Sequence, residues 1–240
     1  MRRTVREKLD SLDKDSAWIF TKQTTDFDEV FRATQLFHDY YQSDENLEQI
    51  FEEYHQDYGV ETNRHRIWIM SQMFGLITKT PFFSRGSRYK DERPTEIFEN
   101  LNKHGIGSSE YNTLKTEQLL KVRIKPIIDS SPDHYDKVIL PLIFSYQVLK
   151  KLKMDYSINH ISTDQFYTYV MTCKNFSELE EAVWFLKENS SVSDLVNNYK
   201  DSSRIQSLFE KNSNLILFNE DKVYINSTFE SVFDDFLESI

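Results

Sequence analysis

The stretch "SSRIQSLFEKNSNLILFNEDKVYIN", residues 202–226, joins a helical pattern to an alternating one. Ile205, Leu208 and Phe209 recur at helical spacing and predict a helix over about residues 202–210. After it, apolar and polar residues alternate on both sides of a turn at Asn219–Lys222, which predicts a β-hairpin. A short helix that leads into a hairpin is typical of a helix-turn-helix with a wing.

Upstream of this stretch, the second half of the chain is rich in helical patterns. They are "VILPLIFSYQVLKKLKM" (138–154), "STDQFYTYVMTC" (162–173), "NFSELEEAVWFLKEN" (175–189) and "SVSDLVNNYK" (191–200). Each carries apolar residues at helical spacing, so each predicts a helix. The second half is therefore expected to be several helices followed by one hairpin.

The first half follows the same plan. We predict helices at about 26–41, with Asp26 as N-cap, at about 44–56 and at 63–77, and then a short hairpin around Arg85-Gly86-Ser87. A further helix starts at Pro94 and ends at Gly105. The following segment, 106–126, is interpreted as looser structure.

Together the patterns predict a mainly α fold with small β-hairpins, arranged as two tandem winged-helix-like subdomains. Residues 129–136, which end in "SPDHYD", are polar and contain a proline, and they are interpreted as a linker. The expected domains are therefore residues 1–130 and residues 131–240.

Composition excludes several function classes. Five glycines, with no GxGxxG and no GxxxxGK[ST], argue against a nucleotide cradle. Cys173 is the only cysteine, which excludes a disulfide within the chain and a Cys-based zinc site, and we expect it to be a small buried residue. The six histidines show no metal-ligand spacing. There is no signal-peptide pattern and no apolar run near the about 18 residues that span a bilayer, so a cytoplasmic protein is expected.

Charge is distributed unevenly along the chain. Its net charge is −10, yet residues 62–90 contain six Lys or Arg and no Asp or Glu. The remaining residues therefore sum to −16. A basic stretch in an acidic chain indicates contact with an anionic partner such as nucleic acid.

The acid-free stretch contains the predicted helix 63–77. Its apolar residues share one face and are expected to be core: Ile67, Met70, Met73, Phe74 and Ile77. The opposite face carries donors and acceptors suited to base edges and phosphates, and the small Gly75 there would allow another surface to approach closely. We predict that this face binds DNA through Asn63, Arg64, His65, Arg66, Trp68, Ser71 and Gln72.

Two further groups are predicted to contact DNA. The hairpin that follows contributes Lys79, Arg85, Ser87, Arg88 and Lys90. The helix at 202–210 contributes Ser203, Arg204 and Gln206 near its start. A plainer interpretation stays open for each helix: the cations at 64–66 could pair with the acids of the preceding helix, and Ser202 or Ser203 could serve only as a cap.

These residues resemble a known family. "ETNRHRIWIMSQMFGLI", then a wing, then "YKDERPTEIFENL" resembles the target-recognition region of type IIS restriction and nicking endonucleases of the AlwI/PleI kind. The residues that match the family's motif are Thr62, Arg64, Arg66, Met70, Phe74, Gly75 and Leu76. In the first half, "YKDERPTEIF" lacks the glycine that the family has at this wing. The second half looks like the family's second recognition subdomain.

The resemblance implies sequence-specific recognition of double-stranded DNA by a monomer through two winged-helix-like subdomains. In the family, a separate PD-(D/E)XK nuclease domain cuts the DNA with Mg²⁺. Here the E-x-K triplet Glu220-Asp221-Lys222 falls in the turn of the terminal hairpin, so we expect no catalytic residue, metal site or cofactor in this chain.

Other functions remain open. A free-standing winged-helix transcription regulator would bind DNA half-sites as a dimer. A protein-interaction module would use the basic stretch to dock an acidic partner. A small-molecule enzyme is the least supported, because no nucleophile, base and orienting group stand in a recognisable arrangement.

Overall fold

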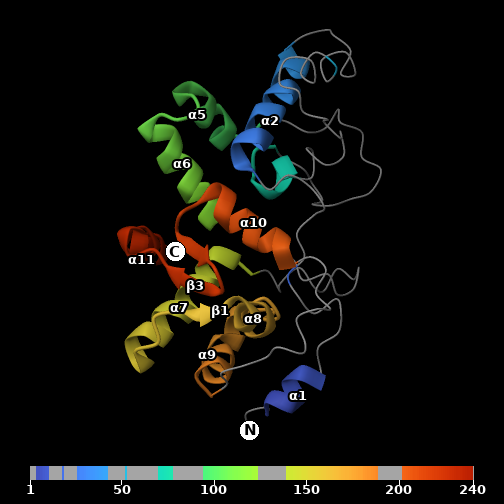
Figure 1. Cartoon of the computed structure of the whole chain (residues 1–240). Helices are drawn as coiled ribbons and strands as arrows, with labels where there is room; N and C mark the ends of the chain where they lie inside the picture. Colours follow the sequence, from blue (N-terminus) through green and yellow to red (C-terminus); the bar gives the residue numbers. More distant parts are fainter. Residues whose placement is uncertain are drawn as a thin grey trace. The chain divides into compact units, whose positions relative to one another are not determined.

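The computed structural model describes residues 4–10, 18, 26–42, 52, 70–77, 94–123, 139–188 and 202–239 (Figure 1). As predicted, the described part is mainly helical, with a small antiparallel sheet. The chain divides into two compact units. The N-terminal unit is Thr21–Val122, and the C-terminal unit is Arg123–Ile240 together with Met1–Phe20.

The first twenty residues were predicted to belong to the first half, and here the structure differs. Trp18 is fully buried in the C-terminal unit, where its backbone N–H donates to the Met171 carbonyl at 2.8 Å and its Nε1–H to the Cys173 carbonyl at 2.7 Å. Its ring meets the rings of Phe144 and Phe166 edge-on, with centroids 6.0 and 6.4 Å apart. These contacts place Trp18 in the core of the C-terminal unit.

The C-terminal unit contains most of the described elements. In chain order they are α7 (Pro141–Tyr156), β1 (Ile161–Ser162), α8 (Thr163–Gln165), the π-helical turn η3 (Phe166–Val170), η4 (Phe176–Glu178), α9 (Leu179–Glu188), α10 (Ser202–Asn212), β2 (Ile216–Asn219), β3 (Lys222–Ile225), η6 (Ser227–Phe229) and α11 (Glu230–Ser239). The short helix α1 (Val5–Asp10) lies in the segment that joins this unit. The helices predicted at 138–154, 162–173, 175–189 and 202–210 are confirmed, whereas α11 was not predicted.

The sheet has the strand order β1-β3-β2, with both pairs antiparallel. Val223 in β3 is opposite Ile161 on one side and Phe218 on the other. The turn between β2 and β3 is Glu220-Asp221, and Glu220 has a positive φ of 56°. This confirms the predicted hairpin at 214–226.

The sheet, α8–η3 and α10 share one apolar core. Phe166 lies edge-on to Phe209 of α10, at 6.1 Å between centroids, and to Phe218 of β2, at 5.3 Å. Ser162 starts α8 with a capping box, in which its hydroxyl accepts from Gln165 N and Gln165 Oε1 accepts from Ser162 N. Cys173 is 2% exposed, as the sequence predicted.

The N-terminal unit contains α2 (Phe27–Gln42), a helical turn at 70–73, α5 (Glu96–His104) and α6 (Ser109–Leu120). Phe31 links these elements, with its ring 5.2 Å from that of Phe98 and 5.3 Å from that of Tyr111. Asp26 caps α2 as predicted, since its Oδ1 accepts from the backbone N–H groups of Asp28 and Glu29. Gly105 ends α5, as predicted.

Helix α6 corrects the prediction of looser structure at 106–126. Its buried residues are Tyr111, Leu119 and Leu120, which do not form the regular stripe that reveals an amphipathic helix in a sequence. Ser108 caps the helix by accepting from Tyr111 N. Asp28 of α2 then accepts from the Tyr111 hydroxyl at 2.9 Å, which fixes α6 against α2.

Several predicted features lie outside the described residues. They are the helix at 44–56 apart from Glu52, the hairpin around 85–87, the linker at 129–136 and the helix at 191–200. In the part of the chain that the structure describes, no helix has the length and apolar character needed to cross a membrane.

Candidate nucleic-acid interface

The described part of the first predicted DNA-binding helix is its C-terminal end. Gly75, with φ of 67°, ends the helix in a Schellman motif: Leu76 N donates to Ser71 O at 2.7 Å and Gly75 N to Gln72 O at 3.0 Å. The helix therefore stops before the predicted residue 77. Gly75 provides the left-handed residue of this cap, whereas the sequence suggested that it lets another surface approach.

The chain leaves this cap and returns to it. Ile77 and Pro94 form an isolated antiparallel bridge, and Thr95 N donates to Leu76 O at 3.0 Å. The Thr95 hydroxyl donates to Gly75 O at 2.7 Å and also caps α5 by accepting from Phe98 N. The two ends of the segment 78–93 are thus held side by side. Its predicted DNA-binding residues, Lys79, Arg85, Ser87, Arg88 and Lys90, lie outside the described residues.

Two predicted DNA-binding residues are buried in the core. Ser71 is 0% exposed, and its hydroxyl lies 2.7 Å from that of Thr34 in α2. Gln72 is 3% exposed, and neither of its amide atoms has a hydrogen-bond partner among the described residues. The prediction that both lie on an exposed face is wrong, because the helix buries a wider face than its apolar residues indicated.

The predicted core positions of this helix agree with the structure where it describes them. Met70, Met73, Phe74 and Ile77 are all buried. Phe74 packs on Phe27 of α2, with ring centroids 5.0 Å apart. The predicted contacts at the start of the helix lie outside the described residues: Asn63, Arg64, His65, Arg66 and Trp68.

The second predicted DNA-binding helix is α10. Ile205, Leu208 and Phe209 are buried, as predicted. Ser203 and Arg204 lie in its first turn, and the structure describes only their place in the helix. Gln206 is partly exposed and belongs to a chain of side-chain hydrogen bonds.

These side-chain hydrogen bonds link η3 to the middle of α10. The Tyr167 hydroxyl donates to Gln206 Oε1 at 2.6 Å, and Gln206 Nε2 donates to Glu210 Oε1 at 2.8 Å. Burial raises the pKa of Tyr167 to about 12, and the nearby charges of Glu210 and Asp164 add to this effect. The phenol therefore keeps its proton, and its role as donor, at neutral pH.

Sequence reasoning missed Tyr167 and Glu210. The spacing of Gln206 and Glu210 by four helical residues is visible in the sequence and is typical of a side-chain pair. The contact with Tyr167 crosses 39 residues of sequence, and no local pattern indicates it.

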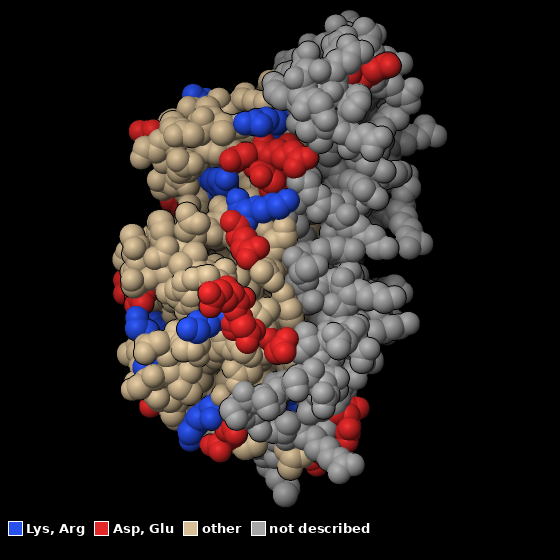
Figure 2. Space-filling view, in the orientation of Figure 1, with Lys and Arg blue, Asp and Glu red and all other residues tan. Residues whose placement is uncertain are grey.

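Charged side chains are interleaved over the described residues, as the face in Figure 2 shows. Several described lysines are paired with acids: Lys115 with Asp28, Lys150 with Asp234, Lys151 with Glu180 and Lys153 with Glu230. Most of the basic stretch found in the sequence, 62–90, lies outside the described residues.

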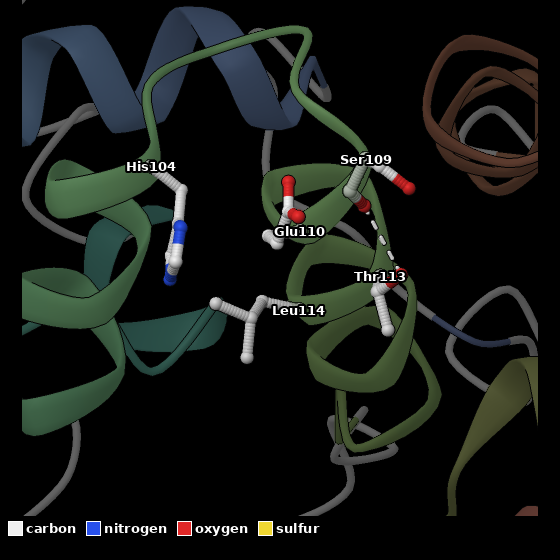
Figure 3. A pocket seen from close by; sticks show the side chains of 5 residues that line it. All are labelled: His104, Ser109, Glu110, Thr113 and Leu114. Carbon is white, nitrogen blue, oxygen red and sulfur yellow. Dashed lines mark hydrogen bonds between the residues drawn. The ribbon is translucent and has the colours of Figure 1, made fainter.

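A shallow pocket of about 320 Å³ lies between α5 and α6 (Figure 3). It is lined by His104, Ser109, Glu110, Thr113 and Leu114. The Thr113 hydroxyl donates to the Ser109 carbonyl at 3.1 Å, so its proton already has an acceptor within the helix. Four of the five lining residues are exposed, and the pocket lacks the paired nucleophile and base of a catalytic site.

The described residues contain no group of three His, Cys, Asp or Glu side chains placed to hold a metal ion. Of the E-x-K triplet, Glu220 and Asp221 form the exposed turn between β2 and β3, as predicted, and the exposed Lys222 begins β3.

No model of a known protein family matches the chain, and no curated protein matches it.

Proposed function

We propose that this chain recognises a specific double-stranded DNA sequence, as the target-recognition part of a type II restriction endonuclease. The observation that carries the proposal is the topology of the C-terminal unit. Its order is α7, β1, α8–η3, η4–α9, α10, β2, β3, with strand order β1-β3-β2. Apart from α9, a winged helix-turn-helix has the same order: a short strand after the first helix, then two helices, then a hairpin whose second strand pairs with that short strand.

In this comparison α10 takes the place of the recognition helix and β2–β3 that of the wing. The two helices of the motif must pack on each other, and α8–η3 and α10 do so through Phe166 with Phe209 and Tyr167 with Gln206. Helix α9 is then an insertion between them. Recognition helices of this class place their N-terminal residues against base edges in the major groove, which suits Ser203, Arg204 and Gln206.

The N-terminal unit supplies a second candidate reader. Its helix ends at a glycine cap, and the next segment, 78–93, starts and finishes at an antiparallel bridge. The wing of a winged helix is a hairpin with its two ends held together, and residues 78–93 contain five Lys or Arg against two acids. Positive side chains here and at Arg64 and Arg66 would neutralise phosphates on either side of the groove.

The nuclease part of the proposal rests on the resemblance to type IIS enzymes. By this resemblance the chain would bind DNA as a monomer. Because its E-x-K triplet lies at a solvent-exposed turn, a PD-(D/E)XK domain with its Mg²⁺ would lie elsewhere. An asymmetric DNA site is expected, because the two recognition units differ in sequence.

Selection from a randomised duplex DNA pool, at moderate salt with Mg²⁺ present, tests the proposal. We expect enrichment of one short asymmetric sequence and no cleavage of the DNA. Enrichment of a palindrome would favour a dimeric transcription regulator instead. If no sequence is enriched, DNA recognition is wrong, and a protein partner for the basic stretch becomes the better hypothesis.

Arginine variants then test whether the helix predicted at 63–77 contacts DNA. Arg64→Ala and Arg66→Ala should each weaken binding to the selected sequence by about 1–3 kcal/mol if the side chain contacts a base. Lys103→Ala, which removes an exposed cation of α5, is the matched control and should leave affinity within a few tenths of a kcal/mol. If both arginine variants bind DNA like the unmodified chain, the helix predicted at 63–77 does not contact bases.

A further inference from the structure

Resting on the proposed DNA recognition, we infer that Gln206 reads an adenine in the major groove, and that Tyr167 and Glu210 are positioning residues that hold its amide. Gln206 lies five residues into α10 and is partly exposed. Both of its amide atoms are already engaged from known directions, by η3 on one side and by the next turn of α10 on the other.

The two neighbours leave one orientation for the amide. A glutamine amide can turn round and exchange its oxygen and nitrogen. The ionised Glu210 carboxylate only accepts hydrogen bonds, so the NH₂ group of Gln206 faces it, at 2.8 Å. The carbonyl oxygen then faces Tyr167, whose hydroxyl donates at 2.6 Å. An acceptor on one side and a donor on the other thus fix the amide.

The fixed amide keeps one donor and one acceptor for a ligand. Of the two lone pairs on Oε1, Tyr167 uses one; of the two hydrogens on Nε2, Glu210 uses one. Adenine presents an N6 donor beside an N7 acceptor in the major groove, and a glutamine amide pairs with both. Guanine presents two acceptors there, so the lone pair of Oε1 that Tyr167 does not use would face an acceptor and find no donor on the base.

The surroundings make this arrangement rigid before DNA binds. Tyr167 is 8% exposed and follows Phe166, which packs on Phe209 of α10. Because the glutamine side chain is already ordered, less conformational entropy is lost when it binds a base. Such prior ordering favours specificity, because a turned amide would pair equally well with other bases.

The competing interpretation is that these hydrogen bonds only hold α10 against η3. Base preference separates the two, because loss of packing weakens the binding of all sequences alike. The unmodified chain and Gln206→Met are therefore compared by selection from a randomised duplex DNA pool. We expect one position of the selected sequence to lose its adenine preference, by roughly tenfold or more, while the other positions keep theirs.

The two positioning residues are tested by their effect on the same base position of the selected DNA sequence. Tyr167→Phe removes the donor to Oε1, and Glu210→Gln replaces an acceptor by a group that can also donate, so both free the amide to turn. Each should reduce the preference for adenine over guanine there. Tyr146→Phe is the matched control, since it removes another phenol of this unit, one that donates to Asp234 at 2.7 Å, and it should leave the selected sequence unchanged.

A variant that gains a new base preference must still be folded, so it distinguishes a change in recognition from loss of folding. Gln206→Lys keeps a partner in Glu210, and a lysine there can donate only, so it should change the preferred base from adenine to guanine. If the unmodified chain selects a sequence and both Gln206 variants select the same one, the inference is wrong while DNA recognition stands. If the unmodified chain selects nothing, the proposed function and this inference fail together.

Discussion

The hydroxyls of Thr34 and Ser71 lie 2.7 Å apart in the buried core of the N-terminal unit. The Thr34 hydroxyl donates a hydrogen bond to the Val30 carbonyl at 2.8 Å, so Ser71 is the donor in its hydrogen bond with Thr34. The helix that ends at Phe74 therefore contacts α2 through a polar pair as well as through apolar side chains.

Ser71→Ala should lower the free energy of unfolding by about 1 kcal/mol, because a buried hydroxyl hydrogen bond is lost. DNA affinity should stay unchanged, since Ser71 is buried. Urea unfolding and DNA titration measure the two effects. Ser71→Ala combined with Thr34→Val removes both partners and should cost less than the sum of the single changes. A loss of DNA affinity at full stability would instead restore Ser71 as a DNA contact.

Gln72→Met should stabilise the N-terminal unit. The amide of Gln72 is buried without a hydrogen-bond partner among the described residues, and such a group costs about 1–3 kcal/mol. Methionine has a similar shape and no polar group to desolvate. The measurement is the midpoint of urea unfolding at constant slope.

Gln118→Met is the matched control, because the Gln118 amide donates to the Phe74 carbonyl at 2.8 Å. That change should destabilise the unit. If Gln72→Met destabilises it as well, the Gln72 amide has a partner in solution and does not carry the cost of an unsatisfied buried group.

Gly75→Ala should destabilise the N-terminal unit for two reasons. A non-glycine residue in the left-handed region costs about 1 kcal/mol, and Gly75 has φ of 67°. An added Cβ would also lie 2.5 Å from Gln118 Nε2, which would have to leave the Phe74 carbonyl.

A double-mutant cycle with Gln118→Ala separates these two costs. Gly75→Ala should be less destabilising in the Gln118→Ala background, because only the backbone cost remains. Equal costs in the two backgrounds would show that Gln118 moves aside freely. Thermal unfolding followed by circular dichroism gives all four stabilities.

The C-terminal unit should lose stability at alkaline pH through Tyr146. Burial, helped by the hydrogen bond to Asp234, raises the pKa of Tyr146 from 10.0 to about 12. The folded state thus holds this proton more tightly, so the stabilisation is complete below pH 10 and is lost as the pH rises towards 12. Tyr146→Phe removes this contribution to the pH dependence.

Stability measured at several pH values between 9 and 12 checks this expectation. The unmodified chain should lose more stability across this range than Tyr146→Phe does. The other tyrosines with raised pKa values, among them Tyr111 and Tyr167, are present in both proteins and cancel in the comparison. Parallel curves would mean that the Tyr146 hydroxyl titrates normally in the folded state.

Local patterns predicted the elements that local interactions define. The hairpin at 214–226 alternates cleanly, α7 is a long apolar run, and α2 and α5 have a polar cap or a terminal glycine. In each case the residues that form the element also contain its signal. The mainly helical class and the positions of most described helices followed from these signals.

Local sequence patterns did not predict features that depend on a partner far away in the sequence. Helix α6 has no regular apolar stripe, and its docking depends on Asp28, more than eighty residues earlier. Ser71 looks like a surface residue until Thr34 is placed beside it. Gln206 was predicted as a reader, but the group that orients it, Tyr167, is visible only in the folded chain.

Trp18 changes what counts as a separable piece of this protein. Because its indole completes the core around Phe144 and Phe166, the N-terminal unit is an inserted domain, preceded and followed in sequence by parts of one other domain. A fragment of residues 123–240 would lack that indole and leave a cavity of tryptophan size. During synthesis Trp18 is made before the inserted domain, and its partners Phe144 and Phe166 are made after it. The inserted domain is therefore expected to finish folding first, although the other domain is the first to begin synthesis.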